Sequence, residues 1–275
     1  MKNSQPPLPA LPPDMECIDT HCHLDMDAYA TDRDTVIRSA FAHGVKRIVT
    51  IGIDLASSKK AVALAEQYPN IYATIGFHPH DAQQVSSNTL NQLAALRDNP
   101  RVVGYGEIGL DYVKQYAPRE VQQKAFADQL HLAKELDLPV VIHDREAHDD
   151  IYALIRTVGL PAKGGVMHCF SGDTELAKKM IDSGLYLSIP GVVTFANAAS
   201  LQAVVRAVRL ESLLVETDGP FLAPVPFRGK RNEPEWVLYT AQMIAQLKEV
   251  PLCEVARSTT ANAIRLFHLP DNASQ

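Results

Sequence analysis

The sequence lacks the long apolar runs, disulfide spacings and basic excess that mark several protein classes. No run approaches the roughly 18 consecutive apolar residues of a membrane-spanning helix, so none is expected. Only four cysteines occur among 275 residues, and no two of them form a C-x-x-C pair. A chain of this length needs no disulfide staples, and its cysteines suit reduced thiols in the cytoplasm. The net charge of −6 argues against a generally basic surface for duplex nucleic acid, but it leaves room for a local basic patch.

The first 14 residues, MKNSQPPLPALPPD, lack the apolar core of a signal peptide. Their proline content predicts an extended or disordered tail. Met15 stands directly before the first predicted strand, so the sequence is compatible either with a start at Met15 or with a genuine tail. We therefore divide the chain into a proline-rich tail, residues 1–14, and one domain, residues 15–270.

Within this domain, short β-branched runs alternate with helical patterns. Strands are predicted at 16–20, 46–52, 71–76, 101–107, 138–142, 164–168, 184–189 and 212–217. Helices are predicted near 33–43, 57–68, 89–98, 118–136, 146–158, 173–183, 199–209, 234–248 and 252–267. Eight βα units with continuously apolar strands predict a single-domain α/β fold, a TIM-like (β/α)₈ barrel. A doubly wound open sheet is the alternative, but no G-x-G-x-x-G segment opens the first βα turn.

Metal-capable side chains follow five of the predicted strands. They are His21, His23, Glu107, His143, His168 and Asp218. Each alone also fits a structural role, such as a hydrogen-bonded histidine or a turn-capping acid. In a barrel, however, the carboxyl ends of all strands meet at one face, where active sites form. The six side chains are therefore expected to converge.

Four imidazoles and two carboxylates exceed the needs of one tetrahedral site that keeps an open position. Two divalent ions that share Glu107 as a bridge would use the whole set. We predict that His21, His23, Glu107 and Asp218 hold one ion and that Glu107, His143 and His168 hold the other. Such a centre activates water for hydrolysis, and Asp218 is the candidate proton acceptor. The donor atoms do not distinguish zinc from magnesium or manganese.

Seven motifs occur in order along the chain: IDTHCHLD, IGFHPH, GEIGLDY, IHDR, HCFSG, ETDGPFLAP and RGKRNEP. From about residue 16 to about residue 268, the sequence resembles the TatD family of metal-dependent hydrolases, most closely its YjjV-like branch. The resemblance implies a TIM-like barrel, a divalent-metal centre and phosphodiesterase activity on nucleic acid, often as a magnesium-dependent deoxyribonuclease. The family's metal ligands match the six residues named above. Gly219 departs from the Ser or Ala of many relatives, which leaves the metal set intact but makes substrate preference less secure.

Two residues near these ligands are candidates for substrate binding. His78 follows the third strand, in GFHPH, and is predicted to contact the scissile phosphate, whereas the role of His80 is left open. Arg145 follows His143 by two positions and is a candidate phosphate ligand, with a salt bridge as the alternative.

The loop VPFRGKRNEP, residues 225–234, is the clearest basic cluster. Arg228 and Arg231 are predicted to bind substrate phosphates. The alternative is that the loop is braced internally by Glu233 or Glu235.

Three further residues stand beside these candidates. Tyr112 and Phe221 have rings suited to stacking on a base, although packing is the commoner use of aromatic residues there. Glu216 is predicted to support a metal ligand rather than to bind metal itself.

We therefore predict a metal-dependent hydrolase acting on ester bonds, with a nucleic acid or another phosphoester as substrate. The alternative enzyme is a metal-dependent amidohydrolase or deacylase, and a metal-binding scaffold without turnover is the third possibility. No membrane partner is expected. The sequence does not fix the oligomeric state, and a monomer is compatible with it.

Overall fold

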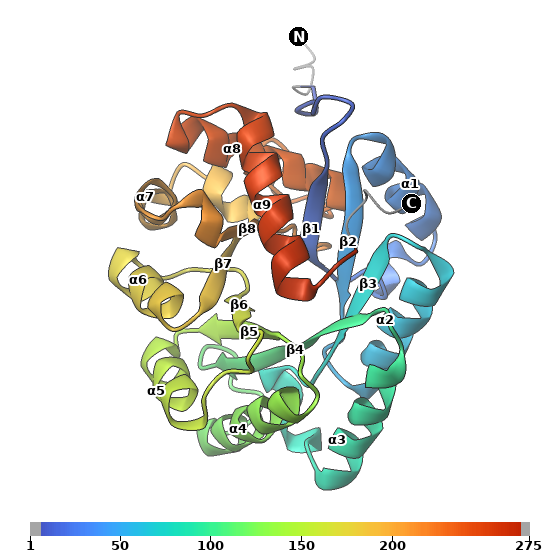
Figure 1. Ribbon diagram of the computed structural model, residues 1–275, viewed down its shortest axis with the longest axis vertical. Coiled ribbons are helices and arrows are strands. Elements are labelled where there is room, and N and C mark those ends of the chain that lie inside the picture. Colours follow the sequence, from blue (N-terminus) through green and yellow to red (C-terminus); the bar gives the residue numbers. More distant parts are fainter. Residues whose placement is uncertain (1–6, 271–275) are drawn as a thin grey trace.

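The computed structural model describes residues 7–270 and contains one eight-stranded parallel sheet in the order β1 to β8, with helices outside it (Figure 1). The strands are β1 (Cys17–Cys22), β2 (Val45–Ile51), β3 (Ile71–Ile75), β4 (Val102–Asp111), β5 (Val140–Arg145), β6 (Gly165–Met167), β7 (Leu185–Ile189) and β8 (Leu213–Val215). The predicted α/β barrel is thus confirmed. The largest shift of a strand boundary is at the end of β4, which runs on to Asp111 instead of ending at residue 107.

A helix follows every strand, as the sequence predicts. The α-helices are α1 (Arg33–Ala42), α2 (Leu55–Gln67), α3 (Ser87–Ala94), α4 (Arg119–Glu135), α5 (His148–Val158), α6 (Thr174–Asp182), α7 (Ala199–Ala207), α8 (Val237–Lys248) and α9 (Leu252–Phe267). Gly44 and Gly184 follow α1 and α6 with φ values of +96° and +92°, a backbone conformation that glycine adopts without a steric penalty.

The apolar core has two layers because the strands are buried on both faces. One layer lies between the sheet and the surrounding helices. The other fills the barrel, where Ile18, Val49, Val141 and Leu214 pack together with Phe267 of α9. In Figure 1, α9 crosses the barrel beside the start of β1. This helix closes the amino-terminal end of the barrel, which leaves the opposite end for the site.

The seam between β8 and β1 closes the barrel with few backbone bonds. The Asp218 N–H donates to the carbonyl oxygen of His21 at 2.8 Å. The buried Asp19 carboxylate accepts from the Thr217 N–H at 2.9 Å and from the Thr217 hydroxyl at 2.6 Å. Burial raises the pKa of Asp19 to about 8 despite these bonds. The segments that close the barrel therefore also carry three of the predicted metal ligands.

The predicted proline-rich tail lies partly outside the described residues, since nothing before residue 7 is described. From residue 7 to residue 12 the chain forms neither helix nor strand. Leu8 and Leu11 are partly buried against the core, and Leu11 lies beside Gly44. Between residues 7 and 270, no helix has both the length and the apolar character needed to cross a membrane.

Candidate metal centre

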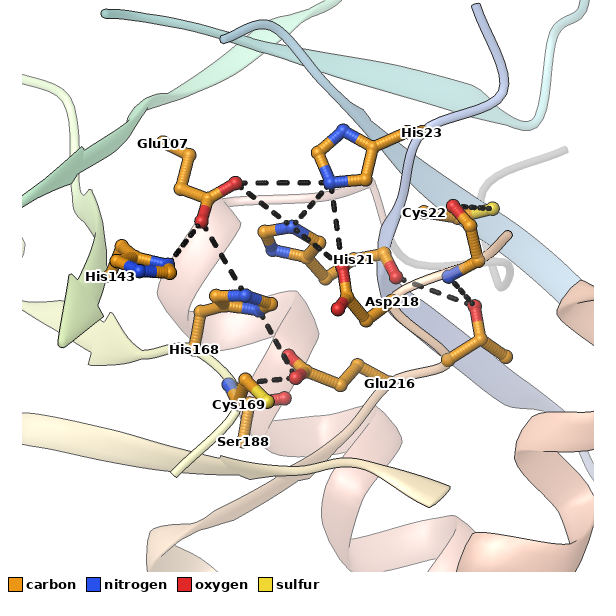
Figure 2. A network of polar contacts seen from close by, with 12 residues as sticks. His21, Cys22, His23, Glu107, His143, His168, Cys169, Ser188, Glu216 and Asp218 are labelled. Carbon is orange, nitrogen blue, oxygen red and sulfur yellow. Dashed lines mark hydrogen bonds and ion pairs between the residues drawn. The ribbon is translucent and has the colours of Figure 1, made fainter. Parts of the chain in front are cut away.

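All six predicted ligands lie together at the carboxyl end of the barrel, around the carboxylate of Glu107 (Figure 2). They come from β1, β4 and β5 and from the segments that follow β1, β6 and β8. His21, His23, Glu107 and His168 are each 5% exposed or less. A cluster of imidazoles and carboxylates this deeply buried is costly unless its charges are compensated.

Two glycines of β4 place Glu107 in the centre of this cluster. Gly106 has a φ of +153°, and a Cβ atom there would lie 2.5 Å from the carbonyl oxygen of Val141. Gly109 has a φ of +142°, and its Cβ would lie 2.0 Å from the carbonyl oxygen of His143. Both glycines therefore let β4 approach β5 more closely than a side chain permits. Between them, the pairing of the two strands shifts by one residue, a bulge that re-aims the neighbouring side chain.

One group of donor atoms surrounds the Oε2 atom of Glu107. His21 Nε2 and His23 Nε2 lie 3.4 and 3.8 Å from this oxygen and 3.3 Å from each other. Asp218 Oδ1 lies 3.8 Å from His21 Nε2 and 3.4 Å from His23 Nε2. Four ligands placed tetrahedrally about 2.05 Å from one ion are about 3.3 Å apart, so these spacings fit a divalent ion with nitrogen and oxygen ligands.

A second group surrounds the Oε1 atom of Glu107. His143 Nδ1 lies 2.8 Å from it and His168 Nε2 lies 3.5 Å from it. The far nitrogens of both rings face carboxylates: His143 Nε2 is 3.5 Å from Asp111, and His168 Nδ1 is 3.1 Å from Glu216. Carboxylates behind metal-bound histidines commonly fix the tautomer and the orientation of the ring. The two oxygens of Glu107 therefore face two donor sets, as a bridging carboxylate would.

The cluster is strongly coupled electrostatically. Burial lowers the pKa of His143, but hydrogen bonds to Asp111 and Glu107 outweigh burial and raise the pKa to about 9. For His168, burial is likewise outweighed by Glu216 and Glu107, and its pKa rises to about 10. Burial raises the pKa of Glu107, yet the surrounding histidines, His168 foremost, hold it well below its usual range. A divalent ion bound here would supply the positive charge that these protons carry in the metal-free protein.

His78 lies in the same cluster, but its hydrogen bonds distinguish it from the ligand candidates. Its Nδ1 accepts the backbone N–H of His80 at 3.1 Å, so the neutral ring carries its proton on Nε2. That Nε2 lies 3.4 Å from Glu107 Oε1. Burial lowers the pKa of His78 to about 4, which keeps the ring neutral at pH 7. With its proton on Nε2, His78 presents a hydrogen-bond donor at the cluster, and its contact with a substrate phosphate stays a prediction.

The predicted arginines fall into two groups. Arg145 is exposed and lines a cavity of about 410 Å³ that opens over the cluster. Lys114, which the sequence analysis does not single out, lines the same cavity. Arg228 and Arg231 are not among the described residues that line it.

Arg228 and Arg231 instead contact residues outside this cavity. Arg231 donates to both oxygens of Asp32, at 2.8 and 2.7 Å, and to Glu233 at 2.9 Å. Arg228 lies over the ring of Phe195, with its guanidinium carbon 4.5 Å from the ring centre. Arg231 thus ties the loop to Asp32 outside it and to Glu233 within it, and Glu233 is one of the two partners in the alternative interpretation of this basic cluster.

Asp111 is a site residue that the sequence analysis misses. One of its oxygens accepts from His80 Nε2 at 2.9 Å and faces His143, while the other accepts two backbone N–H groups. Asp111 is part of the GEIGLDY motif, but its place in the site depends on β4 continuing past Glu107. Glu216 supports His168, as predicted, and it also accepts the Cys169 N–H at 2.7 Å.

The comparisons with known proteins identify the family. The family model described as TatD related DNase matches residues 18–268. The chain belongs to the TatD family. It is 45% identical to the uncharacterized metal-dependent hydrolase YabD of Bacillus subtilis over 251 residues, 91% of this chain and 98% of YabD. It is 39% identical to the uncharacterized metal-dependent hydrolase YcfH of Escherichia coli K12 over 258 residues, 93% of this chain and 97% of YcfH.

A solved structure of this family gives the same result. The crystal structure of YjjV, a TatD homologue from Escherichia coli K12, superposes with a TM-score of 0.88 at 33% identity and covers 92% of this chain and 98% of YjjV. Together with the clustered imidazoles and carboxylates, these relatives make the protein a metal-dependent hydrolase of the TatD family. An N-acetyl-D-glucosamine-6-phosphate deacetylase from Mycobacterium smegmatis, 16% identical with a TM-score of 0.58, shares the fold alone.

Proposed function

We propose that this TatD-family hydrolase cleaves phosphodiester bonds in nucleic acid with two divalent ions, zinc, magnesium or manganese. The proposal rests on the two carboxylate oxygens of Glu107, which face two different sets of histidines. Its Oε2 faces His21 and His23, and its Oε1 faces His143 and His168. Paired ions held by a shared carboxylate are typical of enzymes that displace oxygen at phosphorus.

The bound ions would supply an activated water and neutralise the charge that develops on the phosphate. The chain's own groups perform the remaining steps. Asp218 lines the cavity with one oxygen toward His21 and His23, so it is placed to orient the attacking water and to accept its proton. His78 Nε2–H would donate to a phosphate oxygen, and Arg145 would hold the phosphate from the cavity wall.

Cationic groups at the cavity support a phosphate substrate over an acylated one. Lys114 and Arg145 both line it, although the whole chain carries a net charge of −6. A deacylase needs no such pair, because its substrate carries no charge at the scissile bond. The cytoplasmic location belongs to the proposal as well, and it is supported by four free cysteines.

The direct test is turnover after the metal has been removed. Metal-stripped protein is supplied with Mg²⁺, Mn²⁺ or Zn²⁺ and assayed on DNA, RNA, bis-p-nitrophenyl phosphate and N-acetylated amines. We expect metal-dependent phosphodiester cleavage. Cleavage of the acetylated amines alone would overturn the proposal in favour of a deacylase.

Two arginine variants then test the assignment of the cavity. Arg145→Gln is expected to raise KM for oligonucleotides about 10-fold, the loss of one charge-assisted hydrogen bond. Arg228→Gln is the matched control, because Arg228 is exposed and lies on Phe195 outside the cavity. Equal effects of the two variants would remove Arg145 from the phosphate site.

A further inference from the structure

Two cavities meet at the metal centre. The first, of about 410 Å³, extends toward β3 and β4, and the second, of about 370 Å³, extends toward β6 and β7. They share His143, Arg145, His168, Asp218 and Phe221. A phosphate bound at this junction would therefore have room for one substituent on either side, as the scissile phosphate of a nucleic acid requires.

The walls of the two cavities differ in chemistry. The first cavity has His80, Asp81 and Lys114 beyond the junction, and we call it the charged arm. The second has Val192 and Leu222 there, beside Asp144, Cys169 and Ser171, but no lysine or arginine beyond the junction, and we call it the apolar arm. The apolar arm continues into a pocket of about 210 Å³ whose walls include Phe170, Pro190 and Leu201. Beyond the junction, only the charged arm adds a cationic side chain, Lys114, that a further phosphate of a nucleic-acid chain would meet, whereas the apolar arm suits a flat, uncharged group.

Phe221 stands at the junction with half of its side chain exposed. Four large hydrophobic side chains are exposed among residues 7–270: Val113, Tyr116, Phe221 and Val225. All four belong to the loops that follow β4 and β8, at the end of the barrel that holds the metal centre. Of these four, Phe221 lines both cavities. Its ring lies 6.1 Å from that of His23, almost perpendicular to it, and one face is not covered by this neighbour.

Tyr112, the other aromatic residue considered for stacking, is excluded by its contacts. Its side chain is 8% exposed, and its hydroxyl donates to Asp150 at 2.6 Å. The guanidinium of Arg119 lies over its ring, 4.2 Å from the ring centre. Both its polar end and its face are therefore used inside the protein.

We propose that the apolar arm is a base-binding subsite in which Phe221 stacks on the nucleobase next to the scissile phosphate and Val192 contacts its edge. The inference rests on the proposed phosphodiesterase function and adds a determinant of substrate specificity to it. Base–aromatic stacking tolerates every base because each has a π face. The subsite therefore favours substrates that carry a base, with little preference for its identity.

The test uses two oligonucleotides of equal length, one normal and one with abasic residues on both sides of the cleaved bond. Both are assayed with the unmodified enzyme and with Phe221→Ala. For the unmodified enzyme, we expect KM to be about 5- to 20-fold lower for the normal than for the abasic oligonucleotide. This ratio corresponds to the lower part of the range of base–aromatic stacking energies, which we choose because the Phe221 ring is half exposed. Phe221→Ala should abolish this difference and leave KM for the abasic oligonucleotide unchanged. Val225→Ala is the matched control, since Val225 is equally exposed in the same loop and lines neither cavity.

The outcomes separate the subsite from the function on which it rests. Cleavage of both oligonucleotides with equal KM by the unmodified enzyme would overturn the subsite and leave the phosphodiesterase function intact. An equal rise in KM for both oligonucleotides in Phe221→Ala would do the same, because it would indicate a structural role. Cleavage of neither oligonucleotide under any divalent ion would overturn the phosphodiesterase function itself.

Discussion

Replacing Asp111 by Asn should weaken metal binding at His143 without unfolding the loop after β4. One Asp111 oxygen accepts the backbone N–H groups of Val113 and Lys114, each at 2.9 Å, and the amide oxygen of Asn can keep both bonds. The other oxygen accepts from His80 at 2.9 Å and lies 3.5 Å from His143 Nε2. In Asp111→Asn, an NH₂ group takes this place.

The expected loss of metal affinity follows from the tautomer of His143. Its Nδ1 faces Glu107, so a metal-binding ring carries its proton on Nε2, toward position 111. In Asp111→Asn, two N–H donors, the Asn NH₂ group and His143 Nε2–H, would face each other. The His143 proton then either stays without an acceptor on Nε2 or moves to Nδ1, where it prevents Nδ1 from binding the metal. An unsatisfied buried donor costs about 1–3 kcal/mol. Because the original contact is long, we expect the lower half of this range, a loss of metal affinity of about 10-fold.

The measurement is a titration of metal-stripped protein with Zn²⁺ and Mn²⁺ in competition with a chelator, and urea unfolding serves as the check on folding. Activity should return at saturating metal, because the variant keeps every proposed ligand. Glu235→Gln is the control, since Glu235 also pairs with a histidine, His43, at 3.0 Å but far from the cluster. Unchanged affinity in Asp111→Asn, or an equal loss in Glu235→Gln, would refute the assigned role of Asp111.

Three further predictions follow from the same geometry. Gly109→Ala should destabilise the protein by about 2–5 kcal/mol in urea unfolding, because its Cβ would lie 2.0 Å from a backbone oxygen. Gly184→Ala is the control and should cost only about 1 kcal/mol, because no atom lies within 4 Å of a Cβ at that position. Equal losses of stability would contradict the packing argument. In the metal-free protein, the raised pKa values of His143 (about 9) and His168 (about 10) mean that their charged forms stabilise the fold below pH 6.5 and that this contribution is lost as pH rises through 9 to 10. Metal must displace these protons, so calorimetry in buffers of different ionisation enthalpy should show about two protons released at pH 7 and an affinity that rises with pH; no release would contradict these pKa values. Asp218→Asn should leave the unfolding midpoint of the metal-free protein nearly unchanged and lower kcat by about 10²- to 10⁴-fold, and unchanged kcat in metal-defined buffer would remove Asp218 from the reaction.

The fold and the clustered ligands could be predicted because both depend on local signals. Each β-branched run marks a strand, and five of the eight strands carry a candidate ligand at or within a few residues of their ends. Barrel closure then brings His21 and Asp218 together from opposite ends of the chain without any further information. The bulge in β4 could not be predicted in this way, because Gly106 and Gly109 are typical of a turn as much as of a close strand approach. As a result, the strand was predicted to end at residue 107, and Asp111 went unrecognised.

The substrate residues were harder to predict because the direction of a long side chain depends on distant partners. RGKRNEP is typical of a phosphate-binding loop, but Asp32, 199 positions away in the sequence, takes up the Arg231 guanidinium. A loop sequence cannot reveal a partner that only the fold supplies. Phe221, in the loop after β8, lines both cavities, and its exposure rather than its sequence context distinguishes it from the packed Tyr112.

The seam of the barrel links folding to the chemistry of the site. β1 and β8 are held together through Asp19, Thr217 and the backbone of His21 rather than through a long ladder. A metal ion held by His21 and Asp218 would span the same seam and would add a link where few backbone bonds join the strands. Any ion that binds only the folded chain stabilises it, by about 2.7 kcal/mol at 100 times its Kd. Closing the seam therefore also brings candidate metal ligands together, so His21 and Asp218 belong both to the barrel closure and to the proposed metal centre.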